Sequence, residues 1–305
     1  MGLRIRTNIA AINAQRRLRI STGDLQSSMA KLASGKRINK AADDAAGLAV
    51  SENLRGDVRS LNQAKRNAQD GVSLVQTAEG GLTETSNMLT RLRELAVQAA
   101  SDTIGPEERG FLDKEYVQLK EEIDRITNST EFNGTKLLVG DNYQHDELQN
   151  PEDTYPLEIQ VAHNYLPDAD ALDSDHPVNV IRIDLSNINA YTEGDGSLEL
   201  GRADEGTRVS DKRSAQTSIN TIDKAISRVN DYRSYLGAIQ NRLEITTRNI
   251  GVQSENIEEA RSRIVDTDFA EETANMAQQS ILQQAGISVQ AQANSQPQVA
   301  LSLLG

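Results

Sequence analysis

The segment "INTIDKAISRVNDYRSYLGAIQNRLEITTRNIGVQSENIEEARSRI", residues 219–264, decides the fold class. Apolar residues recur in it at seven-residue spacing: Ile222, Val229, Leu236, Leu243, Ile250, Ile257 and Ile264. A repeat of this period places one apolar stripe along an α-helix and is typical of coiled coils. No proline interrupts the repeat. The segment therefore predicts one helix of about 50 residues.

A second series of the same period lies in the amino-terminal half of the chain: Leu54, Leu61, Ala68, Val75, Leu82, Leu89 and Ala96. A shorter series follows at Leu112, Leu119 and Ile126, with Tyr116 and Ile123 four residues after its first two members. Between the two series, "TIGPEERG" (103–110) predicts a turn between antiparallel helices. Because the long series stand far apart in the chain, their pairing predicts domains that are discontinuous in sequence.

The centre of the chain has a different period. "LEIQVA" (157–162) and "VIRIDL" (180–185) alternate apolar and polar residues, which is the pattern of β-strands. Between them lies an Asp-rich segment with two prolines, which predicts a loop. The predicted fold class is mainly α: a long antiparallel coiled-coil rod of paired N- and C-terminal segments, with a small central β-hairpin.

Composition excludes several kinds of function. The chain has 305 residues, 3% aromatics and no cysteine, so it holds no thiol nucleophile, disulfide or thiolate metal site. No apolar run reaches the roughly 18 residues that a membrane helix needs, which predicts no membrane insertion. The amino terminus lacks the continuous apolar stretch of a secretory signal peptide.

Charge is unevenly distributed over a net −13. Residues 1–40 carry nine Lys or Arg and one acid, whereas residues 141–206 carry sixteen acids and two arginines. A basic terminus fits nucleic acid, an anionic membrane, or an acidic neighbour in an assembly of the protein itself. The missing stacking aromatics argue against nucleic acid.

The carboxyl-terminal segment from Thr273 to Gly305 has no charged residue at all. Protein surfaces normally mix charges in, and a short amphipathic helix without a partner is marginal in water. The segment is therefore expected to be disordered in the isolated chain and buried in an assembly.

Two adjacent acids, Asp43 and Asp44, precede the first long apolar series. Adjacent carboxylates can ligate a metal or share a proton, but no third ligand, base or nucleophile stands near them in the sequence. An acid at the start of a helix accepts hydrogen bonds from free backbone N–H groups and complements the helix dipole. We therefore predict that both residues initiate a helix and take no part in catalysis.

The acidic centre holds the remaining candidates for chemistry. "HDELQ" starts at His145, but the zinc motif His-Glu-x-x-His needs a second histidine where Gln149 stands. The acids of the loop 164–179 (Asp168, Asp170, Asp173 and Asp175) fit a solvated loop, a weak Ca²⁺ site or, least well, a metal-dependent enzyme. The prediction is no enzyme, with no catalytic residue, no metal and no cofactor.

Five stretches carry a resemblance to a known family: "INAQRRL", "KLASGKRINKAADDAAGLAVSENLR", "LVQTAEGGLTETSNMLTRLRELAVQAASDT", "EFNGTKLLVG" and "RSRIVDTDFAEETANMAQQSILQQAGISVQAQANSQPQVALSLL". In this order they resemble the terminal blocks of bacterial flagellin, over roughly residues 1–140 and 206–305. The resemblance implies an inner filament tube from 1–44 plus 256–305 and a coiled-coil rod from 45–140 plus 206–255. Residues 141–205 would form a short hairpin and acidic loop, without large outer domains.

The function implied by the resemblance is that of a secreted subunit that polymerises through its terminal helices into the extracellular flagellar filament for motility. A hook–filament junction protein of the same architecture is the alternative. Implied partners are other flagellin subunits, the export chaperone, the type III flagellar export apparatus, the filament cap and the hook–filament junction proteins. The residues expected to make the polymerisation contacts are Leu18, Leu25, Met29, Leu32, Ile281, Leu282, Val289, Val299, Leu301 and Leu303.

The stretch "RLRELAVQA" (91–99) is a candidate partner site on the rod. A rod helix that contacts the next subunit would explain it fully. The resemblance adds recognition by the vertebrate innate receptor for flagellin, with Arg91, Glu94, Leu95 and Gln98 at the matching positions.

Overall fold

The computed structural model describes residues 8–140, 156–162, 164, 179–194, 196–201 and 206–302, with side chains up to Ser295. The chain packs as two compact units. The terminal unit comprises residues 1–58 and 255–305, and the central unit comprises residues 59–254. The predicted division into tube, rod and hairpin regions stays a prediction, because packing within one chain does not test layers of a filament.

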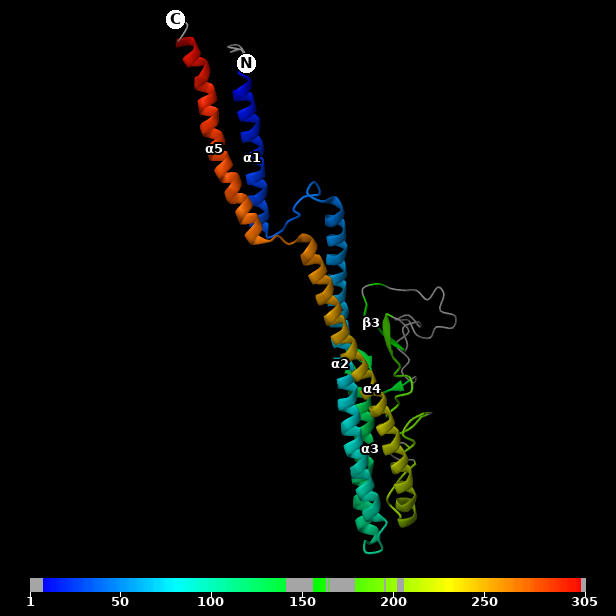
Figure 1. The fold of residues 1–305 in the computed structure, drawn as a ribbon. Helices are drawn as coiled ribbons and strands as arrows, with labels where there is room; N and C mark the ends of the chain where they lie inside the picture. The colour runs from blue at the N-terminus through cyan, green and yellow to red at the C-terminus, as the bar shows by residue number, and fades with distance from the viewer. Residues whose placement is uncertain are drawn as a thin grey trace, which may run out of the picture. The chain divides into compact units, whose positions relative to one another are not determined.

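The terminal unit contains two antiparallel helices, α1 (Ile9–Ser34) and α5 (Phe269–Ser302), which lie side by side (Figure 1). The side chain of Asn8 caps the start of α1 by accepting a hydrogen bond from the Ala11 N–H at 3.1 Å. The helix ends at Gly35, whose φ of 70° is the left-handed conformation common after a helix.

The central unit is built on α2 (Ala45–Ala99), α3 (Pro106–Ser129) and α4 (Lys212–Val265), which lie side by side (Figure 1). The first residues of α2 and the last of α4 belong to the terminal unit. Eleven of the fourteen members of the two predicted heptad series form the core here, with side chains 0–4% exposed: Leu61, Ala68, Val75, Leu82, Leu89, Ala96, Ile222, Val229, Leu236, Leu243 and Ile250. The other three, Leu54, Ile257 and Ile264, belong to the terminal unit and are partly buried. The predicted helical fold is confirmed.

The turn between α2 and α3 falls where the sequence predicts it. Pro106 occupies the first turn of α3, a position where its missing N–H costs nothing. The Arg109 guanidinium donates hydrogen bonds to the carbonyl oxygens of Ala99 and Ser101, both at 2.8 Å. These bonds satisfy carbonyl groups that the end of α2 leaves free.

The predicted hairpin is also present: β3 (Leu157–Gln160) pairs antiparallel with β4 (Val180–Ile183). A second hairpin, β1 (Glu131–Phe132) with β2 (Thr135–Lys136), was not predicted. Its turn is Asn133-Gly134, with φ angles of 52° and 82°. Asn-Gly is the strongest short-range signal for such a turn, so the sequence did contain the information.

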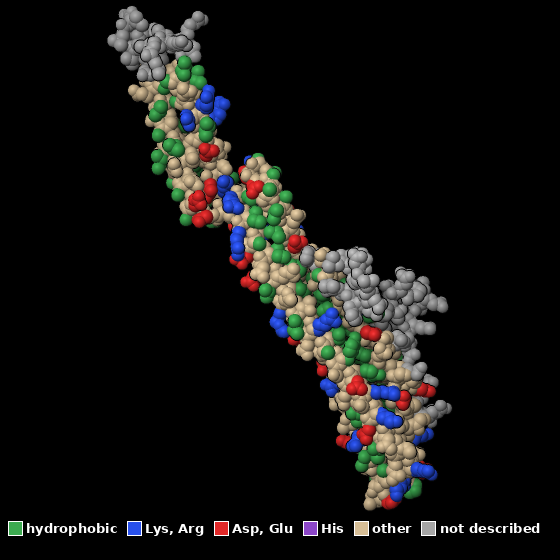
Figure 2. All heavy atoms as spheres, turned by 45° about the vertical axis from the view of Figure 1, so that its right-hand side comes forward, with side chains coloured by type: hydrophobic (Ala, Val, Ile, Leu, Met, Phe, Trp, Pro, Cys, Tyr) green, Lys and Arg blue, Asp and Glu red, His purple; other side chains and the backbone are tan. Residues whose placement is uncertain are grey.

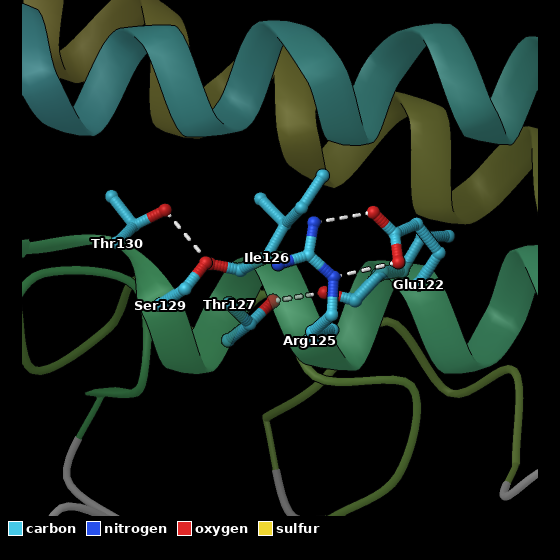
Figure 3. Close-up of polar contacts among 7 residues, drawn as sticks. Glu122, Arg125, Ile126, Thr127, Ser129 and Thr130 are labelled. Atoms are coloured by element: carbon cyan, nitrogen blue, oxygen red, sulfur yellow. Dashed lines mark hydrogen bonds and ion pairs between the residues drawn. The ribbon is translucent and has the colours of Figure 1, made fainter.

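The end of α3 leads into this second hairpin (Figure 3). The hydroxyl groups of Thr130 and Ser129 donate to the Ile126 carbonyl oxygen at 2.8 and 3.3 Å. One turn earlier, the Arg125 guanidinium binds the Glu122 carboxylate at 2.6 Å. The two hydroxyl groups thus add to the hydrogen bond that the Ile126 carbonyl oxygen accepts from the Thr130 N–H at 2.9 Å, just before the chain turns into β1.

Two glycines of α2 let other segments approach closely. A β-carbon on Gly71 would lie 2.3 Å from the Ile159 Cδ1 atom of β3. A β-carbon on Gly81 would lie 2.7 Å from Thr130 Oγ1 and 2.8 Å from Leu138 Cδ1. The hairpins are thus positioned against α2 at points without a side chain.

The most buried stripe of α3 includes two of the five expected residues, Tyr116 and Ile123, and differs at the other three. Leu112, Leu119 and Ile126 are only partly buried. The deepest positions are instead Asp113, Tyr116, Lys120, Ile123 and Thr127, at 0–6% exposure. The reason is that residues 190–192 and 207–209 hydrogen-bond to the polar side chains of this face, in part as described below.

Candidate assembly surface

The seam between α1 and α5 is held by polar contacts. The Asn8 side-chain amide donates to the Ala293 carbonyl oxygen at 2.7 Å. The Ser21 hydroxyl donates to the Gln279 backbone oxygen at 3.1 Å, and the Gln283 amide donates to the Thr22 hydroxyl at 3.3 Å. These bonds fix the register of the two antiparallel helices.

The residues on this seam are mostly small or polar. On α1 the partly or fully buried positions recur with heptad spacing at Ala11, Ala14, Leu18, Ser21, Leu25, Ser28 and Leu32. On α5 they are Met276, Gln279, Gln283, Gly286, Gln290 and Ala293. A β-carbon on Gly286 would lie 3.3 Å from Leu18 Cδ1, so this glycine makes room for a leucine.

Large apolar side chains of the terminal unit point away from the seam. Figure 2 shows hydrophobic side chains spread over the visible face of these helices. Those 48–66% exposed on α1 and α5 are Ile9, Ile12, Ile20, Met29, Phe269, Ile281, Leu282, Ile287 and Val289. Exposed apolar surface on this scale marks an interaction site.

The ten residues predicted to make polymerisation contacts fall into three groups. Met29, Ile281, Leu282 and Val289 are exposed. Leu18, Leu25 and Leu32 are half-buried in the seam within the chain. Leu303 and the side chains of Val299 and Leu301 lie outside the described residues. The role of all ten in polymerisation stays a prediction.

The sequence reasoning missed five equally exposed side chains, Ile9, Ile12, Ile20, Phe269 and Ile287. A signal for three of them was available. The heptad series through Leu18, Ser21 and Leu25 fixes the buried face of α1, and isoleucines off that series must face elsewhere.

The connectors next to these helices are tied to each other. The Arg37 backbone N–H donates to the Val265 carbonyl oxygen at 2.6 Å, and the Thr267 N–H donates to that of Gly35 at 3.1 Å. The Arg37 guanidinium donates to the Ile264 carbonyl oxygen at 2.6 Å. A cationic side chain thus caps the carboxyl end of α4.

The two adjacent acids that precede α2 accept hydrogen bonds from different backbone segments. Asp44 accepts a hydrogen bond from the Gly47 N–H at 2.9 Å, which is the geometry of a helix cap. Asp43 instead accepts from the N–H groups of Asn39 and Lys40, each at 3.0 Å. The Asn39 bond is the main cause that lowers the pKa of Asp43. Asp43 therefore stabilises the preceding turn.

The two helices of the terminal pair differ in charge. Arg16, Arg17 and Arg19 of α1 are exposed, and among the described residues none of them forms an ion pair. The partner helix α5 has no charge after Glu272. The acidic neighbour expected for the basic terminus is thus not supplied by α5.

The stretch 91–99 shows a mixed surface. Arg91, Glu94 and Gln98 are exposed, whereas Leu95 is 0% exposed. The Arg91 guanidinium binds the Glu115 carboxylate at 2.8 Å and that of Glu94 at 3.0 Å. Recognition of this stretch by a receptor stays a prediction. Because Leu95 is buried, it cannot contact a receptor directly and can only pack beneath the exposed side chains.

A buried polar cluster joins α3 to the segment that covers it. The Asp113 carboxylate accepts from the Arg208 guanidinium at 2.7 Å and from the Val209 N–H at 3.0 Å. The Lys120 ammonium group donates to the Thr207 carbonyl oxygen at 3.3 Å. Burial lowers the pKa of Lys120 to about 8. The sequence reasoning missed Asp113 and Lys120, because charged residues are rarely buried.

Sites for other chemistry are not apparent in the described part of the chain. No group of three or more His, Cys, Asp or Glu residues is arranged there to hold a metal ion. The three histidines and the acids of the loop 164–179 lie outside the described residues. Among the described helices, none has a stretch apolar enough over a sufficient length to cross a membrane.

These features define a class. The chain is a mainly helical protein with a well-buried core in its central unit and a concentration of exposed large apolar side chains on its terminal helix pair. Such a pair is typical of a protein whose packing is completed by contact with other molecules.

Comparison with known proteins gives the family. The model of the bacterial flagellin N-terminal helical region matches residues 5–143, and that of the C-terminal helical region matches residues 219–304. A flagellin of Halalkalibacterium halodurans is 41% identical over 98% of this chain and 99% of its own length. The flagellar filament 30.7 kDa core protein of Treponema maltophilum is 37% identical over the same shares. The chain belongs to the bacterial flagellin family.

A solved structure of a putative flagellar hook-associated protein from Vibrio parahaemolyticus shares the fold. It has a TM-score of 0.54 and 14% identity, and covers 73% of this chain and all of its own. At this identity the likeness concerns the fold alone. The full-length sequence relatives above are filament proteins, which favours flagellin over the hook–filament junction alternative.

Proposed function

We propose that this chain is the structural subunit of an extracellular bacterial flagellar filament and that its terminal helix pair makes the contacts on which polymerisation depends. The observation that carries the proposal is that the terminal helix pair exposes most of its large apolar side chains. Its internal seam is mostly small and polar, with three half-buried leucines, while nine large apolar side chains on α1 and α5 remain 48–66% exposed.

The energetics favour assembly. Fully burying a large aliphatic side chain contributes about 1.5–3 kcal/mol, so covering the exposed half of each contributes roughly 1 kcal/mol. Nine such residues sum to roughly 10 kcal/mol gross per subunit. This sum is comparable with the cost of bringing two molecules together. The apolar side chains therefore supply enough driving force for association.

The direction of the apolar side chains favours a polymer over a dimer. Successive residues of a helix are about 100° apart. Ile12 and Ile20 therefore face away from the seam on α1, whereas Leu282 and Ile287 lie on opposite flanks of α5. A two-fold dimer contact would cover only one of these surfaces. Contacts that join different surfaces of neighbouring copies generate rings or helical filaments.

Flagellins are structural proteins, and the function proposed here is mechanical. The terminal segments would be exported unfolded and would fold on docking, with the ordering entropy offset by burial at that moment. The export chaperone would bind the uncharged tail before export. Export apparatus, filament cap, hook–filament junction proteins and the innate receptor are the further partners of this proposal.

Removal of the terminal segments tests the proposal. A chain lacking residues 1–40 and 270–305 should stay monomeric at concentrations at which the full chain forms filaments, while circular dichroism still reports the helices of the central unit. Sedimentation and electron microscopy measure the outcome. Filaments formed by the truncated chain would show that polymerisation does not depend on these segments.

A further inference from the structure

We propose that the outward face of α1 docks on a bilayer surface with anionic lipid head groups while the chain is a monomer. This inference goes beyond the proposed function, because it gives the face a partner that is not a copy of the chain. The outward face is defined by five exposed residues: Ile9, Ile12, Arg16, Arg19 and Ile20.

These five residues lie on one side of the helix. Successive helical residues are about 100° apart, so all five fall within an arc of about 100°. Ile20 is about 200° around the helix from Leu18, which contacts Gly286 in the seam. The three isoleucines are 49–54% exposed. Figure 2 shows Lys or Arg side chains next to hydrophobic ones on the visible face of this helix pair.

The positive charge of α1 is not balanced within the terminal helix pair. The basic residues of α1 and its one acid are Arg16, Arg17, Arg19, Lys31 and Asp24. The partner helix α5 carries no charge after Glu272. An anionic surface would supply the missing negative charge, and each Lys or Arg near such a surface strengthens binding by roughly fivefold.

The isoleucines favour a bilayer over a soluble polyanion. A nucleic acid or an acidic protein segment would match the arginines and leave the isoleucines in water. Nucleic-acid binding without sequence preference also uses stacking aromatics, and α1 has none. A helix that lies in a bilayer surface instead buries its apolar side chains between head groups and acyl chains, while long cationic side chains reach the head groups. A bilayer thus suits both kinds of residue on this face.

A stretch of α4 exposes the same kinds of side chain and provides a matched control. Ile245 and Val252 are 58% and 59% exposed. The basic and acidic residues of the stretch are Arg242, Arg248, Glu244 and Glu255. Positive and negative charges are equal in number there, whereas α1 has four basic residues and one acid. We therefore expect the α4 stretch to make no contribution to docking on anionic lipid.

Binding of the full-length monomer to lipid vesicles tests the inference, at a chain concentration too low for filament growth. One set of vesicles contains phosphatidylcholine alone, and the other contains phosphatidylcholine and phosphatidylglycerol in equal amounts. Flotation measures the bound fraction. The monomer should bind the mixed vesicles much more tightly, and added salt should weaken this binding because it screens the charges. Equal binding to both sets, or binding to neither, would overturn the inference.

Two double variants of α1 show whether its outward face makes the contact. Arg16→Gln with Arg19→Gln should weaken binding to the mixed vesicles by about 25-fold, at roughly fivefold for each arginine. Ile12→Gln with Ile20→Gln should weaken it by about tenfold, because less apolar surface is buried in the bilayer. A loss in the arginine variant without a loss in the isoleucine variant would mean attraction by charge alone, and it would overturn docking on the bilayer.

The matched double variants of α4 are Arg242→Gln with Arg248→Gln and Ile245→Gln with Val252→Gln. Both should bind the mixed vesicles like the natural chain. Circular dichroism checks that all four variants keep their helices. If the α4 variants lose as much binding as the α1 variants, the outward face of α1 is not the docking surface. No outcome depends on filament growth, so the proposed function is tested separately by the truncated chain.

Discussion

The central and terminal units share a heptad repeat, but different kinds of residue occupy its positions in the two units. In the central unit the repeat carries Leu, Ile and Val, which are 0–4% exposed in the core of α2 and α4. In the terminal unit it carries Ala, Ser, Gln and Gly at many seam positions, and nine large apolar residues lie off the seam and are exposed. Period alone thus predicts which face of a helix is buried within the chain. The residues on that face decide whether the chain alone completes the packing.

The two units also differ in their charges. The central unit ties its helices with ion pairs, such as Arg93–Asp223 between α2 and α4 at 2.6 Å. Between α1 and α5 no ion pair is present among the described residues. Exposed ion pairs contribute little to stability but restrict which surfaces fit together. Because α5 carries no charge after Glu272, most of this helix can pack against several neighbours without charge repulsion.

The largest contrast is expected from truncating one apolar side chain in each unit. Leu89→Ala in the core should lower the free energy of unfolding of the monomer by about 3 kcal/mol, because it leaves a cavity. Ile281→Ala, at a side chain 66% exposed, should change it by less than about 0.5 kcal/mol. Urea denaturation measures both. Equal losses would mean that the terminal unit is already closed in the monomer.

Ile281→Ala should nevertheless raise the concentration of subunits needed for filament growth. Light scattering of growing filaments measures that concentration. If the variant polymerises like the natural chain, Ile281 is not part of the assembly surface.

Close packing in the central unit can be tested with two neighbouring glycines of α2. Gly81→Ala should lower the free energy of unfolding by about 2 kcal/mol, because the new methyl group would push against Thr130 and Leu138. Gly80→Ala meets nothing within 4 Å and should raise it by about 0.5–1 kcal/mol through better helix propensity. Thermal unfolding followed by circular dichroism compares them. A stabilising Gly81→Ala would contradict the close approach.

Buried polar groups should give the central unit a dependence on pH. The pKa of Lys120 is about 8 when folded and 10.5 when exposed, because burial penalises its charge. Asp113, Asp124, Glu193 and Arg208 also act on this group. Between these two pKa values the unfolded chain binds more protons, so the contribution of Lys120 to the free energy of unfolding should rise with pH. The slope cannot exceed about 1.4 kcal/mol per pH unit, the value for one proton.

Urea unfolding of the natural chain and of Lys120→Met between pH 8 and 10 measures this slope. The difference between the two free energies of unfolding should increase with pH. A constant difference would show that Lys120 keeps an ordinary pKa. Higher pH is avoided because burial raises the pKa of Tyr116, which acts in the opposite direction as the unfolded chain ionises first.

The smallest effect is expected at the start of α2 in the terminal unit. Asp44→Ala should cost about 1 kcal/mol, because the Gly47 N–H loses its acceptor. Asp44→Asn keeps an acceptor and should cost little. Thermal unfolding and hydrogen exchange at residues 45–48 report on this turn. If Asp44→Ala and Asp44→Asn behave alike, the side chain does not cap the helix.

Much of the fold could be predicted because period and turn residues are local signals. The heptad series predicted α2 and α4, and Pro106 predicted the turn before α3. The β1–β2 hairpin was missed although Asn133-Gly134 announces it. Asp113 and Lys120 could not be predicted as core residues, since their burial depends on bonds to residues 87 to 96 positions away, at Thr207 to Val209.

The candidate site could be predicted only in part, for a similar reason. Apolar residues near both ends indicated an assembly surface, but whether a leucine faces the seam or a neighbour depends on the register of α1 against α5. That register follows from contacts such as Ser21 with Gln279 and Leu18 with Gly286. The sequence therefore grouped Leu18 with Ile281, whereas the fold places one inward and the other outward.

Hydrogen exchange read by mass spectrometry, on monomers and on filaments of the same chain, tests the central claim most directly. We expect amides of α1 and α5 to exchange rapidly in the monomer and to become protected in filaments, while core amides of α2 and α4 are protected in both. Amides of α1 and α5 that are already as slow in the monomer as those around Leu82 and Leu236 would contradict it.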